Sequence, residues 1–409
     1  QSRSSAASDV YKRQATRCRP VLKEPTGGWG AKMQLAAVGM QDVQCLRGSF
    51  RPWTYAFKRA TRFASWTDEI AMDYRPGLRV QVDIPKSGDL LTEMYLQIQV
   101  PAVPAPAGAR WVQPLGYALL RRVRLLLNEQ EIHNIERLWY DLQDQLKAPA
   151  AQAAGLAQMV GRDAPMARPH TLYVPLRLLC CGRGTSRAPL PLQAIPRAAL
   201  KLDVEWETPA VVSGGVVGAD PGFKVAVLCD FVELEDPERT RLLKGGTLAF
   251  ESVIDSDDRT YATDSQGQLR DLPDIRVSLG NVRFAVKALV WVAYDETGPL
   301  FNYLPRPLAS AYVSFNNQRR IEPRPGSYFD VVQPYQHCAR SAPGNVSVYS
   351  FAFDATSRIP SGVADFGALA EASLRGTVAP GLPRFKLKVF SLYYNFLEIG
   401  GASAKVVFV

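Results

Sequence analysis

Hydrophobic and polar residues alternate with a period of two along several stretches of the chain. In residues 94–100 every second position is Met, Leu, Ile or Val, and residues 201–207 and 384–389 show the same alternation. This period is typical of β-strands that bury one face against a core. The denser apolar run Val286–Val292 predicts a strand that is covered on both faces.

Signals for α-helices are few. Asn134 can cap a helix that continues to about Leu146, because four apolar residues recur there at helical spacing, and Pro149 ends it. Asp236, followed by Pro237, predicts the start of a second short helix that ends near Leu243. Residues 150–154 are rich in Ala and fit either another short helix or a loop.

Clusters of Pro and Gly separate the predicted strands, and many short strands joined by turns predict an all-β fold of sandwiches or barrels. A single core rarely grows beyond ~250–300 residues, so the 409 residues predict two domains. We expect the boundary just after the strand 223–232, where the helix at Asp236 begins. This gives an N-terminal domain of residues 33–235 and a C-terminal domain of residues 236–409.

The net charge of +9 is distributed unevenly along the chain. Residues 1–32 contain seven basic and two acidic residues, which leaves +4 for the other 377 residues. No long polybasic run occurs in that body, so the charge does not favour a protein that binds nucleic acid directly. Residues 5–14 resemble a translated sequencing adapter, so we exclude 1–32 from the fold prediction and expect Met33 as the start; a basic arm is the alternative.

The six cysteines form no CxxC pair, which favours reduced and mostly buried thiols over a disulfide framework. No apolar run approaches the ~18 residues that a membrane-spanning helix needs, and no signal peptide is recognisable.

Several segments, in order along the chain, resemble the major capsid proteins of nucleocytoplasmic large DNA viruses, the group that includes iridoviruses and chloroviruses. Residues 35–42 and 57–63 resemble the opening of the family, and a series of short motifs follows. The residues that carry the resemblance in these motifs are Gly88, Asp89, Pro175, Leu190, Pro191, Leu192, Glu238, Arg239, Trp291, Gln333, Pro334, Tyr335, Gln336, His337, Tyr349, Ser350, Phe351, Pro360, Ser361, Gly362, Tyr394 and Asn395. The sequence departs from the family at 128–130, where the family has a Gly-Gly turn, and at 363–370.

The resemblance implies two consecutive eight-stranded jelly rolls, with a few short helices in loops. It also implies a structural role: homotrimeric, pseudo-hexagonal capsomers of an icosahedral virion shell, assembled in the host cytoplasm. The expected partners are further copies of the chain, neighbouring capsomers, and minor capsid and penton proteins, with an internal membrane reached through minor proteins. No direct contact with nucleic acid and no cofactor are expected.

Enzyme chemistry finds little support in the sequence. The three histidines, His133, His170 and His337, lack a second ligand at metal-binding spacing, so we expect no metal site and a hydrogen-bonding role for His337. Cys180 and Cys181 are expected to be buried thiols. Residues 182–187 begin like a phosphate-binding glycine loop but lack its third glycine. The alternatives that remain are a minor capsid or virophage-type capsid protein and, from another class, a carbohydrate-active β-sandwich enzyme.

Overall fold

The computed structural model describes residues 63–409, apart from short stretches in between. The stretches outside the described part are 103–109, 163–168, 182–188, 197, 219, 257–258, 262–273, 296–297, 342–343, 358–359, 381, 383, 401–402 and 409. The predictions for residues 1–32, for the motifs at 35–42 and 57–62, and for the glycine-containing loop 182–187 therefore lie outside the described residues.

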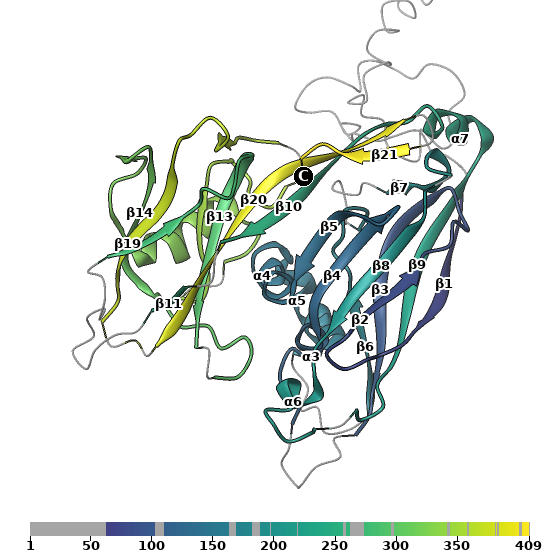
Figure 1. Ribbon diagram of the computed structural model, residues 1–409, viewed down its shortest axis with the longest axis horizontal. Helices are drawn as coiled ribbons and strands as arrows, with labels where there is room; N and C mark the ends of the chain where they lie inside the picture. Colours follow the sequence, from purple (N-terminus) through teal and green to yellow (C-terminus); the bar gives the residue numbers. More distant parts are fainter. Residues whose placement is uncertain are drawn as a thin grey trace, which may run out of the picture. The chain divides into compact units, whose positions relative to one another are not determined.

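The strands up to residue 234 form one sandwich of two antiparallel sheets (Figure 1). One sheet has the order β1-β9-β3-β6, with β7 paired to β3, and the other has the order β2-β8-β4-β5. The strands are β1 (Phe63–Met72), β2 (Arg79–Asp83), β3 (Leu90–Val100), β4 (Leu120–Leu127), β5 (Gln130–Glu136), β6 (His170–Pro175), β7 (Leu190–Pro191), β8 (Leu200–Trp206) and β9 (Lys224–Leu234).

The strands from residue 246 onward form a second sandwich with the same strand connections. Its sheets have the orders β10-β20-β13-β17 and β12-β19-β14-β15, and the short strands β11, β16, β18 and β21 pair at their margins. The strands are β10 (Gly246–Asp255), β11 (Arg259–Tyr261), β12 (Ile275–Ser278), β13 (Ala285–Tyr294), β14 (Leu308–Phe315), β15 (Gln318–Arg319), β16 (Arg324–Pro325), β17 (Ser347–Ser350), β18 (Ala364–Asp365), β19 (Ala372–Val378), β20 (Phe385–Gly400) and β21 (Ser403–Val406). If the short marginal strands are set aside, the described residues of each sandwich form eight strands, and these correspond one to one. This is the jelly-roll topology that was expected.

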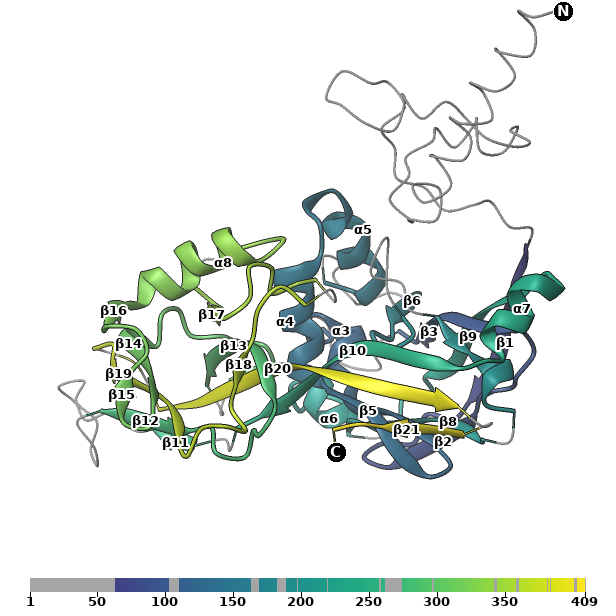
Figure 2. The same cartoon turned by 90° about the horizontal axis from the view of Figure 1, so that it is seen from above.

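The helices lie in the connections between strands (Figure 2). They are α3 (Leu115–Ala118), α4 (Arg137–Lys147), α5 (Ala150–Val160), the 3-10 helix η3 (Leu192–Ala194), α6 (Pro209–Val212), α7 (Asp236–Leu242), the π-helix η4 (Tyr328–Val332) and α8 (Gln333–His337). The prediction of a helix at Asp236 is confirmed. The residues at 150 do form a helix, and it continues to Val160, beyond the 150–154 stretch that the sequence indicated.

The prediction that Asn134 caps a helix is wrong. Asn134 and Ile135 belong to β5, where they pair with Arg124 and Val123 of β4, and the helix begins at Arg137. The backbone of Asn134 gains ladder hydrogen bonds in the sheet, and this tertiary pairing outweighs its preference for a helix cap.

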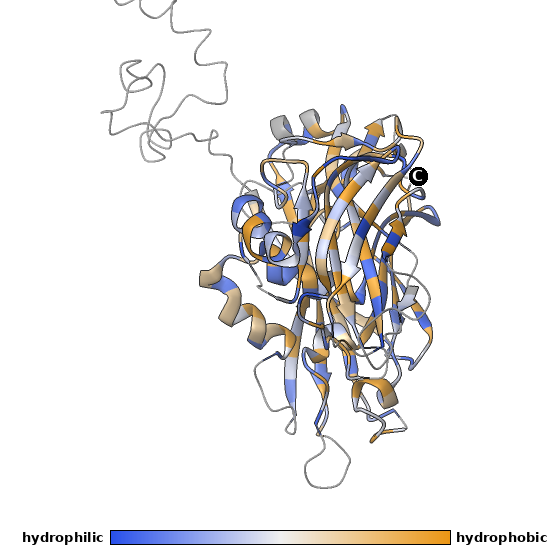
Figure 3. Cartoon of the chain, turned by 90° about the vertical axis from the view of Figure 1, so that its left-hand side faces the viewer, coloured by the Kyte–Doolittle hydropathy of each residue, from blue (hydrophilic) through white to orange (hydrophobic). Residues whose placement is uncertain are grey.

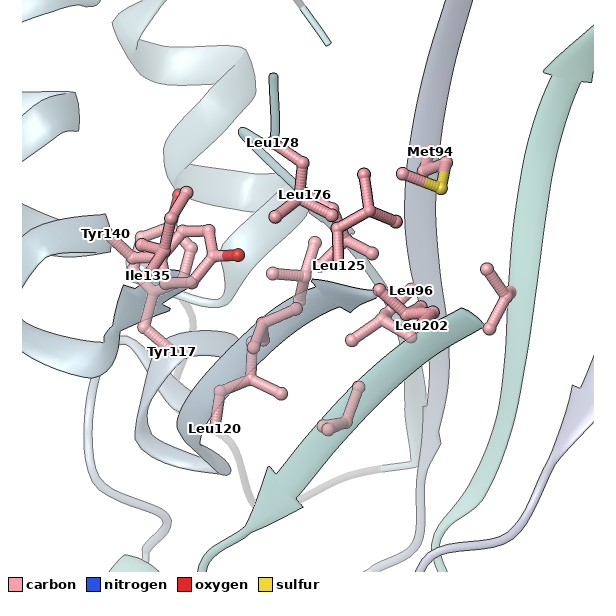
Figure 4. Packing of buried hydrophobic residues seen from close by; sticks show 14 of the residues in the cluster. Met94, Leu96, Tyr117, Leu120, Leu125, Ile135, Tyr140, Leu176, Leu178 and Leu202 are labelled. Atoms are coloured by element: carbon pink, nitrogen blue, oxygen red, sulfur yellow. The ribbon is translucent and has the colours of Figure 1, made fainter. Parts of the chain in front are cut away.

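The predicted alternation is confirmed in β3, where Met94, Leu96, Ile98 and Val100 are all buried and the residues between them are more exposed. Hydrophobic and hydrophilic residues alternate along many of the strands in Figure 3. Figure 4 shows Leu96 and Leu202 pointing toward each other between the two sheets of the first sandwich, within its hydrophobic core. Close-packed branched side chains of this kind supply most of the free energy of folding.

The sheet β10-β20-β13-β17 is covered on both faces, as Val286–Val292 predicted. All residues of β13 from Val286 to Ala293 are buried. Trp291 and Leu289 belong to the core of the second sandwich, whereas Val290 and Val292 belong to the core shared with the first. For β20, the prediction of a half-buried strand is wrong, because Lys388 on its second face is also buried.

Within the described residues, none of the helices combines the length and apolar character that crossing a lipid bilayer requires.

Candidate functional site: the junctions that join and cover the two sandwiches

Asp89 and Arg239 form a junction between the first sandwich and α7, the helix that leads to the second. The Asp89 carboxylate is 3% exposed. It accepts a hydrogen bond from the backbone N–H of Leu234 at 2.7 Å and from Arg239 Nε at 2.9 Å. A buried carboxylate needs such donors, because its desolvation would otherwise be costly. This ion pair fixes the direction in which the chain leaves β9.

Five further residues of the family resemblance lie near this junction, and one lies elsewhere. Gly88 fits closely against β9, because a Cβ there would lie 3.0 Å from the Cβ of Phe231. Leu190 and Pro191 pair with Leu91 and Leu90 of β3, and the backbone N–H of Leu192 donates to the Asp89 carbonyl. Glu238 lies in α7, but its side chain is outside the described part. Pro175 is separate, at the end of β6 opposite Tyr95.

A second group of these residues surrounds α8. The buried Gln333 side chain accepts a hydrogen bond from the backbone N–H of Ser350 at 3.0 Å. His337 Nδ1 donates to the Phe353 carbonyl at 3.1 Å, and the His337 carbonyl accepts from the N–H of Ala355 at 2.8 Å. The start of the helix is therefore fastened to the last residue of β17, and its end to the segment that follows. Pro334 is buried in this packing, whereas Gln336 and Tyr335 are exposed.

The segment after β17 turns back on itself through Pro360, Ser361 and Gly362. Ser361 Oγ accepts from the N–H of Asp354 at 3.1 Å. Gly362 has a φ of 147°, and a Cβ at this residue would lie 2.7 Å from the Phe351 carbonyl oxygen. Only glycine adopts such a conformation without strain. The exposed Pro360 precedes this tight turn.

Aromatic and amide side chains complete the second group. Tyr349 and Phe351 lie edge to face, with their ring centroids 5.1 Å apart, and Trp291 packs 5.2 Å from Phe329 of η4. Asn395 is separate. Its buried amide bonds the backbone of Phe408 through both its oxygen and its nitrogen, and so fastens the C-terminal end to β20.

The structure thus brings the family-resemblance residues into two main groups, one around Asp89 and one around α8. Tyr394 joins the second group, because its hydroxyl is hydrogen-bonded to the backbone of Ser361 and its ring lies 5.3 Å from the ammonium group of Lys287.

A third junction joins the two sandwiches directly, and no motif in the sequence predicted it. Glu251 of β10 forms ion pairs with Lys147 of α4 and with Lys287 of β13. Its backbone carbonyl accepts from His133 Nε2 at 3.0 Å. Lys388 of β20 pairs with Glu136 at 2.6 Å. Partners this far apart, from 36 residues for Glu251 and Lys287 to 252 for Glu136 and Lys388, leave no periodic signal in a single sequence, so only a structure or co-variation could reveal them.

The pKa values of this junction follow from its burial. Burial lowers the pKa of Lys147 to about 8, despite the neighbouring Glu251 carboxylate. Burial acts to raise the pKa of Glu251, but the charges and hydrogen bonds of Lys147 and Lys287 outweigh it and lower that pKa to about 2. Glu251 is therefore ionised at neutral pH.

A cavity of about 620 Å³ lies beside this junction, between α5 and the ends of β3 and β6. This volume is within the range of small-molecule sites. Its charged groups already have protein partners: Glu251 is paired with two lysines, Arg177 with Asp144, and Glu93 accepts a hydrogen bond from Tyr95. The charges that line the cavity therefore neutralise one another, and they do not resemble the pair of catalytic carboxylates of a glycosidase.

Among the described residues, no three His, Cys, Asp or Glu side chains gather in a way that could hold a metal ion. Cys180 and Cys229 are buried, whereas Cys181 and Cys338 are partly exposed, so the expectation of buried thiols holds for Cys180 but not fully for Cys181. Burial raises the pKa of the Cys229 and Cys338 thiols to about 12, which keeps them protonated and unreactive at neutral pH.

Two family models match the chain in succession. Residues 52–221 match the model for the N-terminus of the major capsid protein, and residues 281–403 match the model for the major capsid protein of large eukaryotic DNA viruses. Among characterised proteins, the chain is 26% identical to the major capsid protein of Pyramimonas orientalis virus, over 90% of this chain and 97% of that protein. It is also 26% identical to the major capsid protein of Paramecium bursaria Chlorella virus 1, over 84% and 86% of the two chains.

Solved structures have the same fold. A chain of the quasi-atomic model of the PBCV-1 virus capsid superposes with a TM-score of 0.75 at 21% identity, covering 86% of this chain and 98% of that one. The Faustovirus major capsid protein superposes with a TM-score of 0.68 at 10% identity, covering 96% and 98%. A chain of the Sputnik virophage gives 0.55 at 12% identity, covering 90% and 92%. The double jelly roll is therefore shared with all three, and the virophage fold is the least similar of them.

Proposed function

Since the chain belongs to the major capsid protein family of large eukaryotic DNA viruses, we propose that three copies of it close into a pseudo-hexagonal capsomer of an icosahedral shell. The observation that carries the proposal is the repetition of one eight-stranded sandwich within a single chain. Three chains with two similar sandwiches each supply six similar units around a threefold axis, and such blocks can tile a face of the shell. A ring of this kind requires a head-to-tail interface that closes after three copies.

The chemistry of the described residues favours a structural role without catalysis. The cavity beside Glu251 has its charges neutralised by protein partners, and two of the cysteines have raised thiol pKa values. We propose that the residues carrying the family resemblance act by holding loops in place: Asp89 and Arg239 between the sandwiches, and Gln333 and His337 around α8. We also propose that the boundary between the two domains, residues 33–235 and residues 236–409, lies at the start of α7.

On the basis of the family, we propose further partners for the capsomer. They are neighbouring capsomers, minor capsid and penton proteins, and an internal membrane reached through minor proteins, with assembly in the host cytoplasm. The body of the chain is almost neutral, which supports a shell without direct contact with nucleic acid.

Sedimentation of the purified full chain tests the proposal. A species of three times the 45.1 kDa chain mass, seen as hexagonal blocks by negative-stain electron microscopy, is the expected result. A monodisperse monomer that persists at high protein concentration would contradict the capsomer, because capsid subunits of this class bury large obligate interfaces.

A further inference from the structure

The two sandwiches carry helices at the same point of their topology. In the first, α4 and α5 lie between β5 and β6, the fifth and sixth strands in the order shared by the two sandwiches. In the second, η4 and α8 lie in the matching connection, between β15 and β17. The helices η4 and α8 therefore occupy the same position in the second sandwich that α4 occupies in the first.

Within the chain, α4 covers the outer face of the sheet β10-β20-β13-β17. The Trp139 ring lies 5.3 Å from the ring of Phe390 in β20, and both side chains are buried. At the end of the helix, Lys147 pairs with Glu251 of β10. At its start, Glu136 pairs with Lys388 of β20. This helix-on-sheet contact joins one sandwich to the next.

The corresponding helices of the second sandwich present apolar side chains to solvent. Tyr335 of α8 is 83% exposed, and Phe353 of the segment bonded to α8 is 84% exposed. Val331 and Val332 of η4 are also exposed. We call these four side chains the α8 patch. Two rings exposed to this degree present on the order of 300 Å² of apolar surface, which is about the size of the largest patch on a typical monomer.

The first sandwich presents the matching outer face, that of β1-β9-β3-β6. On β3, Tyr95 and Gln97 point away from the core, and their register partners across the sheet are Leu228 of β9 and Tyr173 of β6. Tyr173 is 40% exposed and Leu228 is partly exposed. This outer face is related by topology to the face that α4 covers in the second sandwich. It carries Tyr95 and Leu228 on its two central strands and Tyr173 on the edge strand β6.

We propose that the α8 patch of one copy docks on the outer face of β1-β9-β3-β6 of a second copy, and so repeats between chains the contact that α4 makes within the chain. The inference rests on the capsomer proposed above and names the surfaces that form it. Six equivalent helix-on-sheet contacts would then run around the ring, three within chains and three between them. The partner that binds the α8 patch is a second copy of this chain, because the chain already makes the corresponding contact internally, between α4 and the sheet β10-β20-β13-β17.

The α8 patch can supply the apolar centre of such an interface. A stable interface needs ~800 Å² per partner, and the apolar anchors at its centre carry most of the binding energy. Tyr335 and Phe353 are anchors of this type, and polar residues at the margins of the two faces would supply the rest of the area.

The test uses full-length variants that introduce a charge on either surface. The double variant Tyr335→Asp, Phe353→Asp removes the α8 patch, and Tyr173→Asp alters the receiving face. Each should raise the dissociation constant of the ring at least ~30-fold, the effect of losing one hot-spot contact, and leave monomers in sedimentation at micromolar concentration. Leu243→Asp, at a residue that is 56% exposed and outside both surfaces, is the matched control and should still form trimers. Circular dichroism checks that all variants fold.

Mixing the two variants gives a decisive result. The Tyr173→Asp chain keeps its α8 patch and the double variant keeps its receiving face, so the mixture should form one intact junction and sediment as a dimer. Trimers of either variant alone, beside trimers of the unchanged chain, would overturn this inference and leave the capsomer standing. A mixture that stays monomeric would also overturn it. An unchanged chain that is itself monomeric would overturn both proposals.

Discussion

At the scale of single residues, the Glu251 carboxylate is the point on which the junction of the two sandwiches depends. Its side chain is 9% exposed and neutralises Lys287, whose side chain is fully buried. Glu251→Gln would leave two lysines without their partner in a site with little water. We expect a loss of about 3–5 kcal/mol in the free energy of unfolding. Urea unfolding at pH 7 measures it, with Glu322→Gln as the control, because Glu322 and its partner Arg319 are both more than half exposed and such pairs contribute under ~1 kcal/mol.

The destabilisation that Glu251→Gln causes should also depend on pH. The pKa of Glu251 is lowered from 4.5 to about 2, so its stabilisation is fully present above pH 4.5 and is lost as the pH falls toward 2. The difference in unfolding free energy between the unchanged chain and Glu251→Gln should therefore narrow across that window. A difference that stays constant from pH 5 to pH 2.5 would mean that Glu251 is not held ionised by its two lysines.

At the scale of elements, two helical glycines are expected to respond to alanine in opposite directions. Gly155 lies inside α5, and a Cβ there would meet no atom within 4 Å. Gly155→Ala should raise the unfolding free energy by about 0.5–1 kcal/mol, because alanine has the higher helix propensity and a less flexible unfolded chain. Gly116 lies in α3, and a Cβ there would be 2.6 Å from Cγ2 of Val174. Gly116→Ala should destabilise by about 1–3 kcal/mol through overpacking. Equal effects of the two changes in thermal unfolding would refute this account.

The elements also show what a single sequence can predict. Local signals succeeded: Asp236 with Pro237 marked α7, the alternation from Met94 marked β3, and the apolar run at Val286 marked a strand buried on both faces. The prediction failed where a distant partner decides the structure. Asn134 joins the ladder with β4, and Lys388 is buried because the α4 side of the molecule covers β20.

The candidate sites follow the same division. The residues around Asp89 and α8 could be named from short motifs, because each motif holds a local turn or helix together, as Gly362 and His337 do. The junction at Glu251 could not be named, because its ion pairs join residues of α4, β10 and β13 that only the folded chain brings together.

At the scale of the whole molecule, the two sandwiches share hydrophobic core. The core of the first sandwich continues without interruption into the outer face of the sheet β10-β20-β13-β17, through side chains such as Val290, Val348 and Phe390. Two domains joined only by a linker would unfold separately, but a shared core couples them, because neither can unfold without exposing apolar surface of the other. We therefore expect the unchanged chain to unfold in a single cooperative transition.

Trp139→Ala tests this coupling. Trp139 is 1% exposed and packs on Phe390 of the second sandwich, so its removal leaves a large cavity at the shared core and costs about 3–5 kcal/mol. Calorimetry should then resolve two transitions where the unchanged chain has one, because the contact that links the sandwiches is weakened while each keeps its own core. Phe231→Ala is the matched control: it costs a similar amount, but Phe231 lies within the first sandwich, on β9 next to Trp66, so the transition should move to lower temperature without splitting. If both variants unfold in one step, the contact of α4 with the second sandwich does not couple the two sandwiches. A similar contact between α8 of one copy and the first sandwich of another would then not be expected to hold copies together.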